Sequence, residues 1–181
     1  MPNAIEMLRE DHRKVQELFE NFEQSNDGKE RICEETIAEL ESHTTLEEEI
    51  FYPAARKQIE DKELIDEAWE EHHVVKLVMA ELKKMSANDE RFKAKFKVMS
   101  ESVKHHIEEE ESELFPMIED KLDAESLGEQ MQARKEELQQ KSSKRSRSVS
   151  KNAKSKTRSS NKRAKRQRSG KKARKASGGR R

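Results

Sequence analysis

The sequence predicts an all-α protein: an antiparallel up-down-up-down four-helix bundle followed by a disordered basic C-terminal tail. Three observations support this prediction. Apolar residues recur at helical spacing in four segments of about 20 to 30 residues. A short pattern of histidine and glutamate occurs twice, and no segment shows the alternating pattern of a β-strand.

The helix boundaries follow from residues that start or stop helices. Asn3 is a good N-cap for the first helix, and Ser25-Asn26-Asp27-Gly28 ends it. Pro53 should kink the second helix or end its regular hydrogen bonding, because proline lacks a backbone donor. We expect helices at about residues 4–24, 29–60 and 62–86, and from about residue 90 past residue 116. Short connections between them favour antiparallel neighbours.

A duplicated unit dominates the sequence. Residues 43–53 and 106–116 both follow the pattern H-x-x-x-E-E-x-x-(x)-aromatic-Pro. Each copy is preceded by a helix that carries another histidine, His12 or His72. Apolar residues follow both of these histidines at positions +3, +6, +7 and +10, which places the imidazoles on the inward face of their helices. The unit is therefore a His helix followed by a His-x-x-x-Glu helix, present twice.

The duplicated polar residues form a candidate metal site. Residues four apart share a helix face, so each copy presents an imidazole beside a carboxylate. Burial of such groups is unfavourable unless cations compensate them. Nitrogen and carboxylate donors suit iron, manganese or zinc, and open positions for water, peroxide or dioxygen favour a pair of non-haem iron ions over manganese or zinc. The six predicted ligands are His12, His43, Glu47, His72, His106 and Glu110.

Several polar residues beside the pattern are assigned other roles. His73 and His105 are turned about 100° away from their histidine neighbours, so we expect them at the surface or outside the ligand set. Glu48 and Glu111 belong to an acidic, solvated face, or they orient a ligand imidazole. Tyr52 is interpreted mainly as a core residue at the kink, with donation of a hydrogen bond or an electron to the nearby site as the alternative.

These residues resemble the hemerythrin-like, HHE cation-binding family across about residues 3–120. The resemblance implies a four-helix bundle that holds two irons through the six residues above and binds dioxygen or reacts with peroxide. The sequence departs from the invertebrate oxygen carriers, which have a H-x-x-x-H pair on the third helix and an aspartate as last ligand. Here Lys76 follows His72 by four positions and the last carboxylate is Glu110. This difference disfavours a simple reversible oxygen carrier and favours iron handling, sensing or peroxide chemistry.

The formal net charge of zero hides a separation of charges. All 38 Asp and Glu lie in residues 1–140 with 19 Lys and Arg, and the other 19 Lys and Arg lie in residues 141–181. We therefore predict a di-iron bundle at 1–121, a polar helical extension at 122–140 and a disordered Lys/Arg/Ser-rich tail at 141–181.

The chain should act inside the cell. It has one cysteine, Cys33, which fits a small buried helix residue better than a reactive thiol. No run approaches the roughly 18 apolar residues of a membrane span, and the N-terminus lacks the pattern of a signal peptide. We expect a cytoplasmic protein, with association to the nucleoid or nucleus through the tail.

The tail predicts binding to a phosphate polymer. A segment with 19 cations and no anion would bind DNA or RNA without sequence preference. Nuclear localisation, an anionic membrane surface, or the acidic bundle itself are open alternatives. The candidate nucleic-acid-binding residues are Lys144, Arg145, Arg147, Lys162, Arg163, Lys165, Arg166, Arg168, Lys171, Lys172, Arg174 and Lys175.

The leading hypothesis is a di-iron protein that is tethered to nucleic acid and binds or handles iron, dioxygen or peroxide there. Two alternatives stay open. One is an enzyme, a di-iron peroxidase or ferroxidase whose tail only sets its location. The other is an oxygen or iron sensor that changes state and acts through a partner. The residues alone do not separate enzymes from binding proteins.

Overall fold

The computed structural model describes residues 3–60 and 62–141, and all regular structure in these residues is helical. The predicted all-α class is therefore confirmed. Residues 142–181 of the predicted disordered tail, with all its candidate nucleic-acid-binding residues, lie outside the described residues, whereas Lys141 is helical. Within the described part of the chain, none of the helices is both long enough and apolar enough to cross a membrane.

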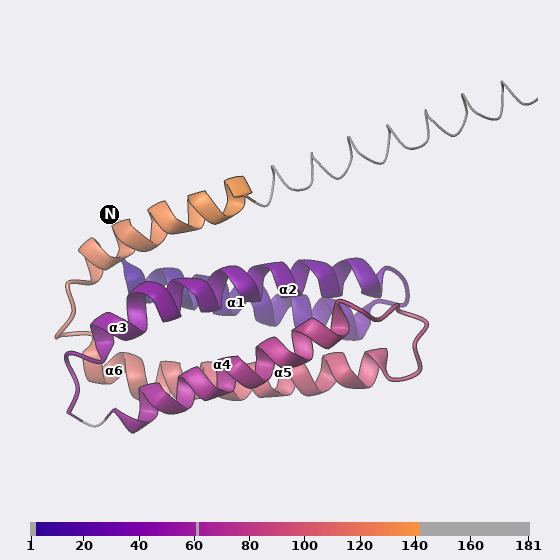
Figure 1. The fold of residues 1–181 in the computed structure, drawn as a ribbon, viewed down its shortest axis with the longest axis horizontal. Coiled ribbons are helices and arrows are strands. Elements are labelled where there is room, and N and C mark those ends of the chain that lie inside the picture. Colours follow the sequence, from indigo (N-terminus) through magenta and orange to yellow (C-terminus); the bar gives the residue numbers. More distant parts are fainter. Residues whose placement is uncertain (1–2, 61, 142–181) are drawn as a thin grey trace, which may run out of the picture. The chain divides into compact units, whose positions relative to one another are not determined.

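Four long helices form the bundle (Figure 1). They run alternately up and down, so each is antiparallel to the next along the chain. Their bounds are Ala4–Gln24 for α1, Lys29–Leu46 for α2, Glu63–Leu82 for α4 and Phe92–Glu109 for α5. The predicted N-cap of α1 is confirmed, because Asn3 Oδ1 accepts hydrogen bonds from the backbone N–H groups of Ile5 and Glu6 at 3.0 and 3.2 Å.

Both copies of the duplicated pattern contain a π-helical turn. The turn η1 spans Glu47–Phe51 and continues into the short helix α3, Tyr52–Ala55. The turn η2 spans Glu110–Leu114 and continues into α6, Phe115–Ile118. The predicted change in regular hydrogen bonding near Pro53 is therefore confirmed. The α-helical pattern is replaced there by a π-helical turn, in which each N–H bonds to the carbonyl five residues back. Each π turn begins at one of the predicted glutamate ligands.

The second helical segment ends earlier than predicted. We expected it to reach about Glu60, but regular α-helix stops at Ala55. The following backbone makes tighter bonds to the third residue back, from Lys57 N–H to the Ala54 carbonyl and from Gln58 N–H to the Ala55 carbonyl. These 3₁₀-type hydrogen bonds end the helical segment before the connection to α4.

The apolar core consists of two clusters, and the buried histidines lie between them along the chain. The first surrounds α3 and α6, where the rings of Phe51 and Phe115 are 5.6 Å apart. The second fills the opposite half of the bundle and contains Val15, Phe19, Leu40, Val75, Phe96 and Met99. On α1, for example, His12 lies between Leu8 of the first cluster and Val15 of the second.

A further helix spans residues 124–141. Its residues up to Glu136 belong to the same compact unit as the bundle. Met131 is fully buried in the first apolar cluster, and Leu122 and Leu127 contact that cluster at its edge. The extension therefore contributes to the core through a few apolar side chains, while a domain boundary at residue 121 stays a prediction.

Cys33 is buried in the second apolar cluster, as predicted. Burial raises the pKa of its thiol to about 11, and the neighbouring Glu34 and Glu30 add to this effect. Because the thiolate is the reactive form, we expect native Cys33 to react with a disulfide reagent at pH 8 at least roughly a hundredfold more slowly than in the unfolded chain. The reaction rates with and without denaturant test this expectation. Equal rates would show that the thiol is accessible in the folded protein.

Candidate metal centre

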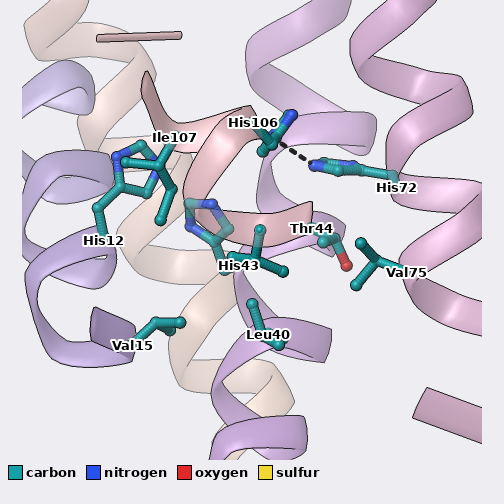
Figure 2. A pocket seen from close by; sticks show the side chains of 10 residues that line it. His12, Val15, Leu40, His43, Thr44, His72, Val75, His106 and Ile107 are labelled. Atoms are coloured by element: carbon teal, nitrogen blue, oxygen red, sulfur yellow. Dashed lines mark hydrogen bonds between the residues drawn. The ribbon is translucent and has the colours of Figure 1, made fainter. Parts of the chain in front are cut away.

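The fold brings all six predicted ligand residues into one layer of the core. Each long helix supplies one histidine, and the first residue of each π turn supplies a glutamate. The close view of the core shows the four imidazoles directed toward a common region (Figure 2). None of the six side chains belongs to a residue that is more than 4% exposed. The buried set is His12, His43, Glu47, His72, His106 and Glu110.

Each glutamate faces two imidazoles, one from each copy of the duplicated unit. Glu47 Oε2 lies 3.1 Å from His43 Nε2 and 3.3 Å from His72 Nε2. Glu110 Oε2 lies 3.3 Å from His12 Nε2 and 3.6 Å from His106 Nε2. The two halves of the site are therefore interleaved, because each carboxylate joins the two repeats.

The donor atoms form two groups that can each hold a metal ion. The first contains one ligand atom from each of His12, His43, Glu47 and Glu110, all within 4.8 Å of one another. The second contains Glu47, His72 and His106. Glu47 belongs to both groups, so its carboxylate would be shared by cations held in the two groups.

The outer nitrogen of each imidazole also faces a carboxylate. His12 Nδ1 lies 2.7 Å from Glu111 and His72 Nδ1 lies 3.0 Å from Glu48. These contacts favour the orienting role over the solvated one, because a partner on Nδ1 fixes the ring so that Nε2 points inward.

Two further carboxylates in these contacts were not assigned from the sequence. Glu71 Oε2 lies 2.7 Å from His106 Nδ1, and Asp11 Oδ2 lies 3.9 Å from His43 Nδ1. Asp11 immediately precedes His12, and Glu71 occupies the equivalent position before the first histidine of the second repeat. This shared position in both repeats is the signal that could have identified them.

Tyr52 is more than a core residue. Its hydroxyl donates a hydrogen bond to Glu110 Oε1 at 2.8 Å and lies 3.3 Å from His72 Nε2 and 3.4 Å from His106 Nε2. Burial raises the pKa of Tyr52 well above its usual range, and the Glu110 carboxylate adds to this effect. Without a cation the phenol therefore stays neutral and acts as a donor. Tyr52 was expected mainly as a packing residue, but its hydroxyl also contacts Glu110, a predicted ligand.

The pKa shifts indicate that the ionisable groups of this buried layer are not all charged at once. Burial raises the pKa of Glu47 well above its usual range, and the neighbouring Glu110 raises it further. Burial would also raise the pKa of Glu110, but His106 and His12 lower it below its usual range. Burial lowers the pKa of His43 well below its usual value. Without cations, Glu110 is therefore the ionised carboxylate of the pair, and Glu47 is the protonated one.

The donor set fits metal ions because several of its buried atoms lack a hydrogen-bond partner among the described residues. Both oxygens of Glu47 are in this state, as are His12 Nε2 and Glu110 Oε2. Buried polar atoms without partners are unfavourable by about 1–3 kcal/mol each. Cations bound between these atoms would satisfy them, and imidazole with carboxylate donors suits iron, manganese or zinc.

The comparison with known families agrees with this geometry. Residues 3–118 match the family model of the hemerythrin HHE cation binding domain. The chain belongs to this family. The buried groups of His and Glu that could hold a metal ion are consistent with the cation binding named in the description of this hemerythrin family.

Two curated relatives and one solved structure are similar to this hemerythrin-like chain. A DNA nickase of Nostoc sp. is 30% identical over 145 residues, which cover 77% of this chain and 41% of that protein. A hemerythrin-like protein of Schizosaccharomyces pombe is 31% identical over 129 residues, 69% of this chain and 64% of that protein. The chain thus spans less than two thirds of either relative. The crystal structure of a hemerythrin HHE cation binding domain-containing protein from Mycobacterium kansasii matches with a TM-score of 0.66 and 28% identity, covering 76% of this chain and 88% of that one.

The lysine that departs from the oxygen-carrier pattern has a clear role in this hemerythrin-like site. Lys76 Nζ lies 2.5 and 2.6 Å from the two oxygens of Glu48, which in turn contacts His72 Nδ1. Asp11 has a similar partner, because Lys135 Nζ lies 2.5 Å from its Oδ1. Two of the four outer carboxylates, Glu48 and Asp11, are therefore paired with a lysine. The lysine partly neutralises the negative charge of these two carboxylates.

The exposed histidines lie outside the site of this hemerythrin-like protein, as predicted. His73 and His105 are both exposed, although each directly follows or precedes a buried histidine. Neither is a member of the two buried ligand groups. His73 therefore provides a control for substitutions of the buried imidazoles.

A small cavity adjoins the imidazoles of the hemerythrin-like site (Figure 2). Apolar side chains, among them Val15, Leu40 and Val75, form its wall opposite the histidines. Thr44 also lines it, and the buried Thr44 hydroxyl has no hydrogen-bond partner among the described residues. The cavity has room for about one water-sized molecule, and the Thr44 hydroxyl is an available hydrogen-bonding group on its wall.

Replacing Thr44 by valine should stabilise the metal-free protein. The change keeps the side-chain shape but removes the unpartnered hydroxyl, so we expect the free energy of unfolding to rise by about 1–2 kcal/mol. Urea denaturation in the presence of a chelator measures this difference. A substitution at the half-buried Thr45, whose hydroxyl donates to the Glu41 carbonyl at 2.6 Å, serves as the control. A decrease in stability for Thr44→Val would show that its hydroxyl has a partner in solution.

Proposed function

We propose that this protein holds two non-haem iron ions in the buried layer and uses them to bind or react with dioxygen or peroxide, or to handle iron. The observation that carries the proposal is the pair of donor groups that share Glu47, whose buried oxygens have no hydrogen-bond partner among the described residues. Manganese or zinc would suit the same donors, but we propose iron because its redox chemistry would use coordination positions left open for dioxygen or peroxide. The proposed ligands are His12, His43, Glu47, His72, His106 and Glu110.

The residues around the site would support this function in distinct ways. Iron bound here would supply electron transfer to dioxygen or peroxide. The outer carboxylates, such as Glu48 and Glu111, would hold the imidazoles in the orientation needed for binding. Tyr52 would donate a hydrogen bond on the Glu110 side, and the apolar wall of the cavity would limit access of water.

Metal content and the visible spectrum of the purified protein test the proposal. We expect two irons per chain, and we expect the His43→Ala, His106→Ala double variant to lose both the metal and the visible absorption. His73→Ala is the matched control, because it removes an exposed imidazole from the same helix as a buried one. A metal-free wild type, or a double variant with unchanged iron content, would contradict the proposal.

Turnover experiments distinguish the forms that this function can take. A protein that binds iron or dioxygen would change its spectrum once for each equivalent of ligand. A peroxidase or ferroxidase would consume many equivalents of peroxide or ferrous iron per chain. A sensor would show a ligand-dependent change in stability without turnover. The His43→Ala, His106→Ala variant provides the background rate for all three measurements.

We also propose that residues 141–181 tether the protein to nucleic acid, in the cytoplasm or at the nucleoid or nucleus. This second proposal is supported by the 19 Lys and Arg of this segment and by the similarity to a protein named DNA nickase. The acidic residues 1–140 would oppose such binding, so the basic segment would have to supply it.

Fluorescence anisotropy with labelled duplex DNA tests the tether. We expect the affinity to fall by about a thousandfold or more between roughly 50 and 200 mM salt, as for binding through phosphate contacts. Glutamine at the twelve candidate tail positions should abolish binding. Salt-independent binding would contradict the proposal, as would a glutamine variant that binds like wild type. Stronger binding to anionic vesicles than to DNA would replace the nucleic-acid tether by a membrane anchor.

A further inference from the structure

A third group of possible metal ligands lies on the outside of the bundle. Glu71 of α4 and His105 and Glu109 of α5 each offer one ligand atom, and these atoms lie within 4.8 Å of one another. His105 and Glu109 are one helical turn apart, with 3.3 Å between His105 Nε2 and Glu109 Oε1. The group therefore bridges two neighbouring helices and combines an imidazole with two carboxylates.

The side chains of this outer group are accessible from solvent to different degrees. The side chain of His105 is 65% exposed, whereas those of Glu109 and Glu71 are 28% and 24% exposed. The imidazole is thus the most accessible member of the group, and the two carboxylates are partly accessible to solvent.

A small cavity is lined by residues of both the outer group and the buried layer. These are Glu71 and Glu109 from the outer group and His106 and Glu110 from the inner site, beside the apolar Leu64, Ala68 and Leu114. Glu110 is only 2% exposed, and its Oε2, which faces His12 and His106, has no hydrogen-bond partner among the described residues. A buried carboxylate group with an unpartnered oxygen therefore lies close to the outer ligands.

Negative charge is concentrated at this place, because Glu71 and Glu109 bring two carboxylates together in the outer group. A bound cation would relieve the repulsion between them.

Glu71 belongs to both the outer group and the support of the inner site. Its Oε2 contacts His106 Nδ1 at 2.7 Å. Because a carboxylate has two oxygens, Glu71 can hold this imidazole with one and an outer cation with the other. The outer and inner positions are thereby joined through a single side chain.

We propose that Glu71, His105 and Glu109 form an outer site for a divalent cation such as ferrous iron, from which the cation passes to His106 and Glu110. Imidazole and carboxylate donors with open positions suit weak, exchangeable binding of such ions. The inward transfer rests on the proposed function of the buried layer. Binding at the outer site does not depend on it.

Titration of the metal-loaded full chain with Co²⁺ in a calorimeter tests the outer site. We expect one additional equivalent of Co²⁺ to bind to the wild type. His105→Ala and Glu109→Gln should each weaken this binding by at least about 10- to 100-fold, as for the loss of residues that support a metal. The inner metal content should be unchanged. Glu101→Gln and His73→Ala, which remove an exposed carboxylate and an exposed imidazole elsewhere, should behave like wild type.

The rate of ferrous iron uptake by metal-free protein tests the inward transfer. We expect His105→Ala and Glu109→Gln to slow uptake by about tenfold or more while the final iron content stays at the wild-type value. Co²⁺ binding that is equal in wild type and both variants would overturn the outer site, and equal uptake rates would overturn the transfer. A chain that binds Co²⁺ at the outer site but takes up no inner metal would contradict the proposed function and leave the outer site intact.

Discussion

Replacing Glu47 by glutamine is expected to remove both metal ions and to stabilise the metal-free protein. Glu47 belongs to both buried donor groups, so the loss of its charge weakens the two positions together. In the absence of metal, the buried Glu47 without a hydrogen-bond partner among the described residues is protonated in the folded protein, whereas it is ionised in the unfolded chain at pH 7. Glutamine avoids the free-energy cost of taking up this proton on folding. We expect the free energy of unfolding at pH 7 to rise by about 1–3 kcal/mol.

The pH dependence gives this prediction a second readout. The folded-state pKa of Glu47 is raised above its unfolded value, so protonation favours the folded state. The metal-free wild type should therefore lose stability as the pH rises above about 4.3, the usual pKa of glutamate, whereas Glu47→Gln should lack this contribution. The difference between the two should disappear near pH 4.

Metal analysis and urea denaturation from pH 4 to 7 check both effects of Glu47→Gln. Glu34→Gln is the matched control, because it changes the same group at an exposed position of the same helical segment. Full metal content in the Glu47→Gln variant would exclude a bridging role. A metal-free variant that is less stable than wild type at pH 7 would show that the Glu47 carboxylate has stabilising partners within the fold.

Removal of the metal with a chelator is expected to produce the largest change in stability. A ligand that binds only the folded state, at a free concentration a thousandfold above its dissociation constant, stabilises by about 4 kcal/mol per site. For a domain of this size we expect the unfolding midpoint to fall by at least roughly 10 °C when both ions are removed. The buried donors then return to their unpartnered state.

Thermal unfolding followed by circular dichroism measures this change. The His43→Ala, His106→Ala variant is the control, and its midpoint should not respond to the chelator because the ligand groups are incomplete. A wild-type midpoint that is insensitive to chelation would show that the buried layer contributes to stability as a set of core residues and not as a metal site.

Local sequence patterns were sufficient for the fold class and for the candidate donors that the structure brings together in the core. Helical periodicity and breakers predicted the long helices, and the Asn3 cap was assigned correctly. The six donors were identifiable because the duplication repeats them at helical spacing, and spacing along a helix decides which side chains face inward. The departure at Lys76 was also visible, although its partner was not.

Only the tertiary structure decided which residues meet across helices. The contact of Glu71 with His106, the hydrogen bond from Tyr52 to Glu110 and the outer group around His105 all join residues far apart in the sequence or on different helices. These contacts depend on how neighbouring helices are rotated and on the extra residue that each π turn inserts. The sequence by itself thus determined the donors and their helices, whereas their partners follow from interhelical register, which no local periodicity encodes.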